Sequence, residues 1–145
     1  MNLEAQWIVG FVDGEGCFHI AINSNQEMKL GVQVLAEFVV VQHESDRQIL
    51  EALKAFWGCG VVRKNNKDCL CYRVRDLEQL KTRIVPFFEK HKLKTRKRID
   101  FDTFRDVIAL MDQQAHLTLE GVEKINQIRK TMNRKGISKI ESSSS

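Results

Sequence analysis

The sequence predicts an α+β domain in which several helices pack with one antiparallel sheet. Four segments have the length and pattern of strands, and polar turns join them into two pairs, as in β-hairpins. Between and after these pairs, apolar residues recur with the helical period. The 145 residues, 43% hydrophobic and 29% charged, suffice for one globular core. We therefore expect a single domain over residues 1–138.

The first helix is expected near the N-terminus, where apolar residues recur at helical spacing. These residues are Leu3, Trp7, Ile8, Phe11 and Val12. Gly10 and Gly14, four residues apart, would let a second helix backbone approach closely. The helix ends in Asp13-Gly14-Glu15-Gly16 and leads directly into an alternating strand over residues 17–23.

A second strand is expected over residues 30–41, after a polar turn. Its inward side chains would be Val34, Ala36, Phe38 and Val40, and its outward ones Gln33, Leu35, Glu37 and Val39. The outward face is more apolar than an exposed face should be. A shift of one residue in this register therefore stays open.

The next helix is expected to begin at a capping box, with Ser45 at the N-cap and Gln48 at N3. Gly58-Cys59-Gly60 would end it. A hairpin follows, in which residues 61–64 and 70–75 flank the polar turn of residues 65–68.

Three further helices complete the predicted fold. Asp76 and Gln79 form a second cap, and Pro86 is expected to break or kink the helix that they start. A long helix is expected over residues 94–111, and Thr118 would begin the last one. Residues 139–145, which end in four serines, look like a disordered tail.

The charge distribution indicates a polyanionic partner. The net charge is only +4, but residues 90–98 hold six Lys or Arg and no acid. A second basic cluster consists of Arg129, Lys130, Arg134, Lys135 and Lys139. One such run is commonly a solvated helix face, whereas two clusters together with basic strand residues favour a phosphate backbone.

The remaining composition indicates a reduced, intracellular protein with no membrane partner. No apolar run has the length of a membrane span, and the N-terminus lacks the pattern of a signal peptide. The cytoplasm of a prokaryote or an organelle, either chloroplast or mitochondrion, fits this composition. Cys17, Cys59, Cys69 and Cys71 lack the usual spacing of zinc ligands and are expected to be free thiols.

The end of the first helix carries the strongest functional signal. A helix C-terminus has partial negative charge, so an acid such as Glu15 is disfavoured there unless a cation compensates it, and a divalent metal is the favoured one. The segment Ile8-Val9-Gly10-Phe11-Val12-Asp13-Gly14-Glu15-Gly16 resembles the LAGLIDADG signature of homing endonucleases. Taken alone, these nine residues also fit a helix with a glycine cap, a tight turn and no chemistry.

The resemblance extends over nearly the whole chain. The motif, the capping-box helix, the hairpin and the Pro-Phe-Phe segment before a basic helix all follow the family's order. The resemblance implies a homing endonuclease-like α-β-β-α-β-β-α fold, with one four-stranded antiparallel, saddle-shaped sheet and C-terminal helices. It also implies the single-motif, homodimeric type, because each chain offers one motif while both DNA strands must be cut.

The resemblance also implies the chemistry. Glu15, where many members have Asp, would bind the metal beside the Gly14 carbonyl. Gln42 would order the active-site water, and Lys94 would polarise that water or stabilise the transition state. Asp13 would close the helix end. Mg²⁺ is the expected ion, with Mn²⁺ substituting for it and Ca²⁺ binding without supporting cleavage.

The resemblance further implies which residues form the dimer interface and the DNA-binding surface. The homodimer interface would include Trp7, Gly10, Phe11, Asp13 and Gly14. The outward sheet face would read bases in the major groove through His19, Asn23, Gln33, Glu37, Arg63, Asn65, Arg73 and Arg75. Lys97, Arg98, Arg129 and Lys130 are expected near phosphates.

The function expected from all this is site-specific, metal-dependent cleavage of double-stranded DNA at a long pseudo-palindromic target, by an intron-encoded homing endonuclease. Two alternatives stay open: an intron RNA maturase, and a DNA-binding regulator that has lost cleavage. The joint presence of Glu15, Gln42 and Lys94 favours the nuclease, because an acid directed at phosphates repels them unless a metal is bound.

Overall fold

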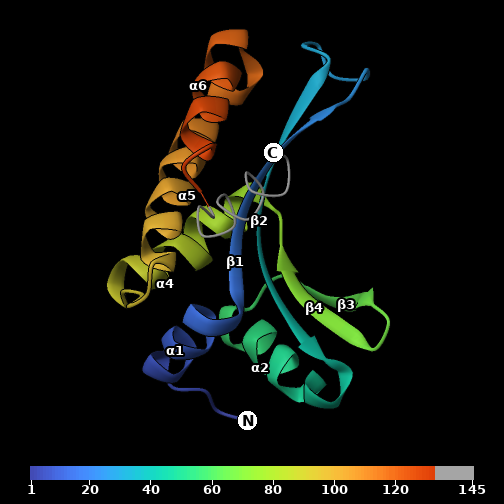
Figure 1. The fold of residues 1–145 in the computed structure, drawn as a ribbon, viewed down its shortest axis with the longest axis vertical. Coiled ribbons are helices and arrows are strands. Elements are labelled where there is room, and N and C mark those ends of the chain that lie inside the picture. The colour runs from blue at the N-terminus through green and yellow to red at the C-terminus, as the bar shows by residue number, and fades with distance from the viewer. Residues whose placement is uncertain (133–145) are drawn as a thin grey trace, which may run out of the picture.

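The computed structural model describes residues 1–132 and confirms the mixed α and β architecture (Figure 1). The predicted serine-rich tail and the basic residues Arg134, Lys135 and Lys139 lie outside the described residues. The elements in chain order are α1 (Ala5–Glu15), β1 (Gly16–Ser24), β2 (Val32–His43), η1 (Glu44–Asp46), α2 (Arg47–Trp57), β3 (Val61–Asn66), β4 (Cys69–Val74), α3 (Leu77–Gln79), η2 (Leu80–Ile84), α4 (Val85–Lys90), α5 (Lys97–Asp112), η3 (Ala115–Leu117) and α6 (Leu119–Arg129).

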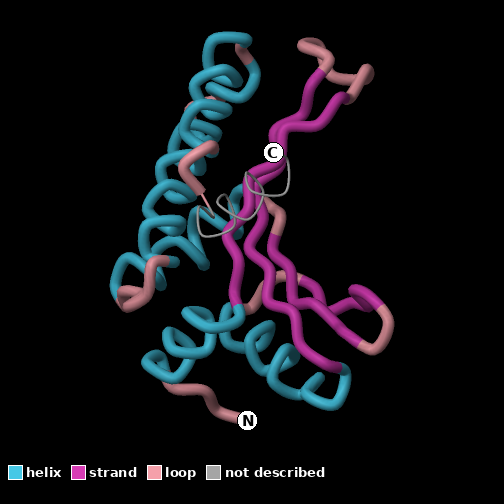
Figure 2. The backbone as a smooth tube through the Cα atoms, in the orientation of Figure 1, coloured by secondary structure: helices cyan, strands magenta, loops and turns pink. Residues whose placement is uncertain are grey.

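The strands form one antiparallel sheet in the order β1-β2-β4-β3. β4 pairs with β2 only from Phe38 to His43, so the first half of β2 pairs with β1 alone. Figure 2 shows the result: a twisted sheet from which the β1–β2 hairpin extends as a two-stranded arm, beyond the ends of the shorter β3 and β4.

One face of the sheet is covered by helices and holds the core. The predicted alternation in β1 and β2 is confirmed, including the register that was left open: Phe18 pairs with Phe38, both are fully buried, and Glu37 faces outward. Phe18 also contacts Phe88, Phe101 and Phe104 from the helices. These rings anchor α4 and α5 to the sheet at the level where β1 begins.

Two boundaries in β2 and α2 differ from the prediction. β2 begins at Val32 rather than Leu30, because Gly31 adopts a positive φ of 74° in the turn that precedes it. The capping box at Ser45 is wrong: no side chain caps α2, and the Ser45 amide instead donates to the ring of His43. The predicted end of α2 is confirmed, since Gly58 is its left-handed C-cap.

The helices after the sheet agree with those expected from the sequence, with two differences. Asp76 caps α3 as predicted. The helical path then changes type through the π-helical turn η2, and Pro86 lies in the first turn of α4, where its missing amide is tolerated. α5 begins at Lys97 rather than Lys94, and Thr118 caps α6 as predicted. Within residues 1–132, no helix is both long enough and apolar enough to cross a bilayer.

Candidate active site and nucleic-acid interface

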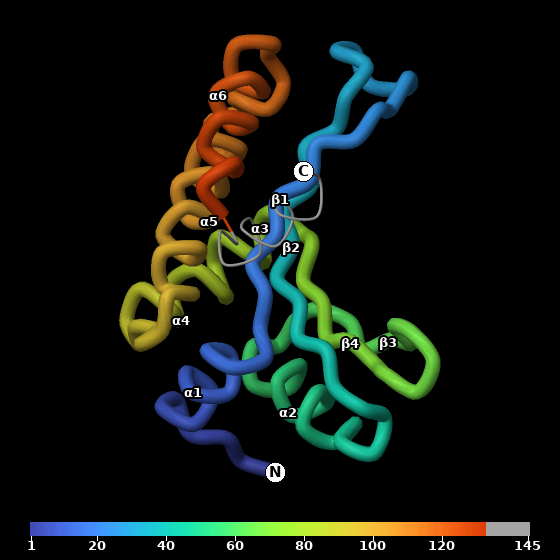
Figure 3. The backbone as a smooth tube through the Cα atoms, in the orientation of Figure 1, coloured from blue at the N-terminus to red at the C-terminus, as the bar shows by residue number. Residues whose placement is uncertain are grey.

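The helix α1 ends at Glu15, and β1 starts at the next residue without an intervening loop, as Figure 3 shows (blue). The Gly16 amide donates to the Val12 carbonyl and closes the helix. A Cβ at position 16 would lie 2.7 Å from Val12 Cγ1, so a side chain does not fit at this junction. The junction exposes Glu15, and no hydrogen bond or ion pair to its carboxylate occurs within the described part of the chain.

Asp13 connects this junction to the segment that leads into α5. Its Oδ2 accepts from the Lys94 amide at 2.8 Å, and its Oδ1 accepts from the Thr95 amide at 3.1 Å and from the Thr95 hydroxyl at 2.7 Å. Burial alone would raise the pKa of Asp13, but these hydrogen bonds and the nearby Lys97 charge lower it below the ordinary value of 3.8. The structural role expected for Asp13 has this physical basis.

Lys97 lies on the same junction. Its ammonium donates to the Val12 carbonyl at 3.2 Å and to the Gly16 carbonyl. The charge that was expected at a phosphate is thus engaged with the C-terminal end of α1, where a cation is favourable. Sequence reasoning missed this contact and that of Thr95. The sequence does not distinguish Lys97 from the other basic residues of the run 90–98. For Thr95, the one available signal was a hydroxyl-bearing residue just before a helix, a position where such side chains commonly accept or donate hydrogen bonds at a helix end.

The sheet register and the Asp13 contacts bring the three expected catalytic residues to one end of the sheet. Gly16 pairs with Val40, so Gln42 lies two residues beyond that pair, toward α1. It is half-buried at the end of β2. Lys94 is exposed, and its amide is bound to Asp13, two residues before Glu15. Within residues 1–132, no hydrogen bond or ion pair joins the side chains of these three residues, so their roles stay predictions.

The donors at this junction suit a hard cation only in part. Among residues 1–132, no group of three or more His, Cys, Asp and Glu side chains is arranged to hold a metal ion. The end of α1 does offer the exposed Glu15 carboxylate and helix-terminal carbonyls such as that of Gly14. Oxygen donors of this kind fit Mg²⁺, which commonly takes one or two carboxylates and completes its shell with water and phosphate oxygens.

One face of α1 is open. Trp7 and Phe11 stack with their ring centroids 4.9 Å apart, and Trp7 is 44% exposed. A Cβ at Gly10 or Gly14 would meet no atom within 4 Å. These four residues have spacings of three and four, so they share one face of the helix. Asp13, which was also assigned to the dimer interface, is turned toward α5 instead.

The outer face of the sheet carries most of the expected base-reading residues. His19, Asn23 and Gln33 are exposed on the β1–β2 arm, where Asn23 pairs with Gln33. Asn25 donates to Gln33 at 3.2 Å. On β3, Arg63 is exposed opposite Cys71, and Asn65 lies at the irregularity between Lys64 and Asn66.

Two of the candidates on this face are paired with each other. Arg75 Nε donates to Glu37 Oε2 at 2.7 Å, and Glu37 also lies opposite His19 in the register. Arg73 lies beside them, opposite Val39. The expected phosphate contacts Arg129 and Lys130 are elsewhere: they end or follow α6, which packs on α5 in the helical layer. Arg98 is exposed in the first turn of α5.

His43 connects the end of β2 to the β3–β4 turn. Its Nδ1 accepts from the Ser45 amide at 3.0 Å, and its Nε2 lies 3.2 Å from Asp68 Oδ2. The Glu44 amide also donates to the Asp68 carbonyl at 2.8 Å. These contacts attach the β3–β4 hairpin, which includes Arg63, to the end of β2, which includes Gln42.

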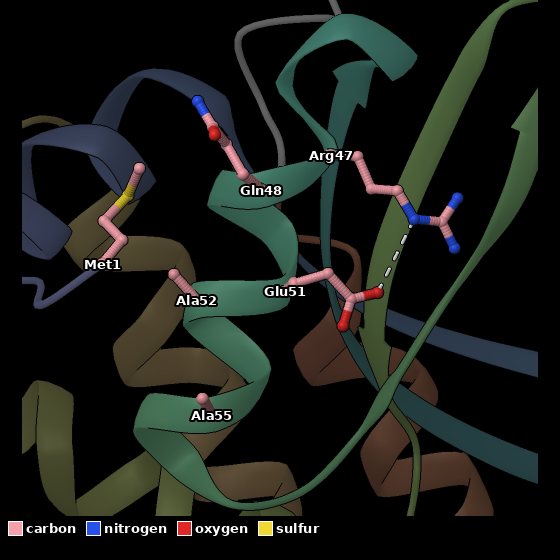
Figure 4. A pocket seen from close by; sticks show the side chains of 6 residues that line it. All are labelled: Met1, Arg47, Gln48, Glu51, Ala52 and Ala55. Carbon is pink, nitrogen blue, oxygen red and sulfur yellow. Dashed lines mark ion pairs between the residues drawn. The ribbon is translucent and has the colours of Figure 1, made fainter.

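A shallow hollow lies between the N-terminal segment and α2 (Figure 4). Its lining residues are Met1, Arg47, Gln48, Glu51, Ala52 and Ala55. Its one ion pair joins Arg47 and Glu51 at 3.8 Å, and both side chains are about half exposed. A pair of this kind supplies neither a nucleophile nor a buried charge, so the chemistry is assigned to the end of α1.

The fold and the sequence are both similar to known endonucleases. The crystal structure of the homing endonuclease I-TnaI matches with a TM-score of 0.88 and 52% identity, over 92% of this chain and 90% of that one. I-SmaMI, bound to an uncleaved DNA target in the presence of calcium ions, matches with a TM-score of 0.89 and 37% identity, over 92% of this chain and 46% of that one.

Curated relatives give the same result. "Probable intron-encoded endonuclease 2" of Neurospora crassa is 35% identical over 134 residues, which is 91% of this chain. The chain spans 30% of that relative's length, and 24% and 26% of two others. Residues 8–108 match the family described as LAGLIDADG endonuclease. With that match, and with the motif helix and its sheet arranged as described above, the chain belongs to the LAGLIDADG endonuclease family.

Proposed function

We propose that this protein is an intron-encoded homing endonuclease that hydrolyses both strands of a long, pseudo-palindromic DNA target. The observation that carries the proposal is the exposed Glu15 carboxylate at the C-terminal end of α1, to which no described residue is paired. A carboxylate in this position is unfavourable beside a phosphate backbone unless a cation binds between them. The intron-encoded relatives and the homing endonuclease neighbours support the same activity.

The proposed metal is Mg²⁺, held by the Glu15 carboxylate and the Gly14 carbonyl, with Mn²⁺ able to substitute. When bound, such an ion activates a water molecule and neutralises charge on the reacting phosphate. Ca²⁺ would bind without supporting cleavage. One carboxylate is a small donor set, which fits a site completed by DNA oxygens and by a second motif helix.

The chain's own residues have separate proposed tasks. Glu15 would hold the ion through its exposed carboxylate. Gln42, at the same end of the sheet, holds the attacking water through its amide. Lys94 has an exposed ammonium next to the Asp13 contacts and stabilises negative charge on the phosphate. This order of tasks needs no covalent nucleophile.

The proposed target lies along the outer face of the sheet. The β1–β2 arm extends that face well beyond β3 and β4, which suits a long recognition sequence in the major groove (Figure 1). Arg98 is proposed to contact phosphates. A second copy of the chain, packed through the open face of α1, would supply the other half-site and the second carboxylate.

A cleavage selection tests the proposal. Purified protein is incubated with a randomised double-stranded library in Mg²⁺, Mn²⁺ or Ca²⁺, beside Glu15→Gln and the control Glu123→Gln, which changes an exposed acid on α6. We expect one near-palindromic sequence to be cut in Mg²⁺ by the wild type and by Glu123→Gln. Glu15→Gln should bind that sequence and leave it intact.

Other outcomes point to the alternatives. Specific binding with no cleavage in Mg²⁺ or Mn²⁺ contradicts the nuclease and favours a regulator. Binding of a structured intron RNA in preference to any DNA duplex favours a maturase. Cleavage by Glu15→Gln at the wild-type rate removes Glu15 from the chemistry.

A further inference from the structure

The outer face of the sheet consists of rows of side chains, because paired residues of neighbouring strands lie side by side. From the tip of the β1–β2 arm toward α1, the outward pairs are Asn23–Gln33, Ala21–Leu35, His19–Glu37 and Cys17–Val39. The first and third pairs are polar, and the second and fourth are apolar. The polar pairs can read bases through hydrogen bonds, whereas the apolar pairs have no strong donor or acceptor with which to do so.

The largest apolar area of this face lies at its α1 end, where two successive rows are apolar. Val39 pairs with Cys17, and Val41, the next outward residue of β2, pairs with Cys71 of β4. Both valines are partly exposed. Val61 of β3 belongs to the row of Val39 and is 45% exposed. We call Cys17, Val39, Val41, Val61 and Cys71 the outer apolar patch.

The outer apolar patch is close to the candidate active site and carries positive charge beside it. Val40, which lies between the two valines in sequence, pairs with Gly16, the residue directly after Glu15. Arg73 belongs to the row of one valine, and Arg63 belongs to the row of the other. Two guanidinium groups next to an apolar area favour a polyanionic partner over an apolar protein surface. We therefore take the occupant to be the DNA duplex that the rest of this face is proposed to bind.

Apolar side chains can distinguish base pairs in the major groove through one group. The C5 methyl of thymine is the apolar group on that edge, and the other base edges present hydrogen-bond donors and acceptors. A valine against a polar edge excludes water without replacing its hydrogen bonds, which is unfavourable. A valine against the thymine methyl removes two apolar surfaces from water, which is favourable. The two effects act in the same direction and favour thymine.

We propose that the outer apolar patch reads thymine methyl groups, with Val39 and Val41 as the specificity-determining residues, in the part of each half-site nearest to the cleaved bonds. The proposal rests on the proposed function and deepens it, because it assigns a base to a defined part of the target. Two residues along a strand span about 7 Å, and successive base pairs are about 3.4 Å apart. The two thymines should therefore lie about two base pairs apart.

Substitution within the DNA tests the proposal on the wild-type protein. In the sequence obtained from the cleavage selection, deoxyuridine replaces thymidine at one position at a time, which removes the methyl group alone. At the two inner positions, each replacement should raise the Kd in Ca²⁺ by about fourfold, as expected for one buried methyl group. The salt dependence of binding should stay unchanged, because a methyl contact releases no counterion. Where cytosine replaces one of these thymines, 5-methylcytosine should recover part of the lost affinity.

Protein variants assign the methyl contacts to the two valines. The double variant Val39→Ser/Val41→Ser removes the apolar groups from the outer face. It should bind the thymidine and deoxyuridine targets about equally. The control Leu119→Ser makes the same kind of change at a 72% exposed residue at the start of α6, and it should retain the fourfold preference for thymidine. The deoxyuridine series on the wild type needs no variant, so it decides even if the double variant does not fold.

The outcomes separate this proposal from the proposed function. A wild type that binds no DNA specifically overturns both. A wild type that binds and cuts its target, with the Kd changed by less than about 1.5-fold by deoxyuridine at every inner position, leaves the nuclease intact and overturns the reading of methyl groups. A selected target without thymine in the inner part of its half-sites does the same, as does a folded double variant that still prefers thymidine. If deoxyuridine has no effect while the double variant changes the oligomeric state, the patch contacts protein instead of DNA.

Discussion

Thr95 donates a hydrogen bond of 2.7 Å from its hydroxyl to the carboxylate of Asp13, 82 residues earlier in the chain. The contact joins the end of the motif helix to the start of the basic segment. It places a signature residue of the motif in a supporting position, while the neighbouring Glu15 stays exposed. Two acids only two residues apart thus have different environments: one accepts three hydrogen bonds from the protein, and the other is available to an ion.

The first prediction concerns Asp13→Asn. Because the folded pKa of Asp13 is below its ordinary value of 3.8, its stabilising contribution is fully present above 3.8 and disappears as the pH falls through the lower folded value. At neutral pH the substitution should lower the free energy of unfolding by about 1–2 kcal/mol, a range reduced for partial exposure.

Urea denaturation over a pH series measures this effect. The stability difference between wild type and Asp13→Asn should shrink as the pH falls below 3.8, while Glu123→Gln shows no such convergence. A difference that stays constant down to the acid-unfolding range would mean that the charge of Asp13 does not strengthen its hydrogen bonds with Lys94 and Thr95.

The second prediction concerns Glu37 and Arg75. Their bond uses Arg75 Nε, which leaves the terminal amino groups of the guanidinium to contact a guanine edge. Glu37→Gln should loosen Arg75 and relax the base preference at one position of each half-site by about 1–3 kcal/mol. The free energy of unfolding should change by less than about 1 kcal/mol, because the Arg75 side chain is 44% exposed and water screens the pair.

Binding to a set of single-base target variants measures this preference. The control is Arg98→Gln, at a proposed phosphate contact, which should weaken all targets alike and reduce the salt dependence of binding. Equal effects of the two substitutions across the whole target would contradict a reading role for the Glu37–Arg75 pair.

The sheet could be predicted well from the sequence because successive side chains of a strand point to opposite faces, one buried and one exposed. Phe18 and Phe38 face the helices and Glu37 faces outward, as their alternation required. The apolar outward residues Leu35 and Val39 raised the question of a register shift, but a shift would expose Phe38, and the structure has no such shift.

The contacts of individual polar side chains were less predictable. Ser45 has the spacing of a capping box, but a short 3₁₀ turn precedes α2 and the Ser45 amide binds His43. Lys97 was indistinguishable from its basic neighbours in sequence, because its partners, Val12 and Gly16, are about eighty residues away along the chain. Local spacing predicts faces and helix ends, whereas these contacts depend on how distant elements pack.

The third prediction separates the two sides of the His43 ring. His43→Asn retains an acceptor near Nδ1 for the Ser45 amide, and His43→Gln retains a donor near Nε2 for Asp68. Both contacts are exposed, so each variant should lower the free energy of unfolding by about 1 kcal/mol or less. His43→Asn alone should loosen the β3–β4 turn.

Amide exchange at Cys69 and Glu44, beside the Asp68 contact, measures the turn. Faster exchange in His43→Asn than in His43→Gln is expected. The same variant should relax base preference at the positions near Arg63 and leave those near His19 unchanged, since the β1–β2 arm is a separate part of the sheet. Equal loosening in both variants would show that the ring acts through packing and not through its two nitrogens.

The fourth prediction tests the proposed homodimer through Gly10. Nothing lies within 4 Å of a Cβ built at this position, so in an isolated chain Gly10→Ala should stabilise α1 by about 0.5–1 kcal/mol. In a dimer packed through this face, the same methyl group would separate the two helix backbones and weaken association. The substitution therefore has opposite effects on the monomer and on the dimer.

Sedimentation velocity and thermal unfolding over a range of protein concentrations distinguish these effects. We expect Gly10→Ala to raise the dissociation constant of the dimer and to make the Tm less dependent on concentration, while Gln127→Ala, at an exposed position of α6, leaves both unchanged. Trp7→Ala should weaken association as well, because it removes an exposed ring from the same face. If Gly10→Ala instead raises the Tm equally at every concentration and leaves the oligomeric state unchanged, the open face of α1 is not where two copies meet, and the second carboxylate must come from another surface.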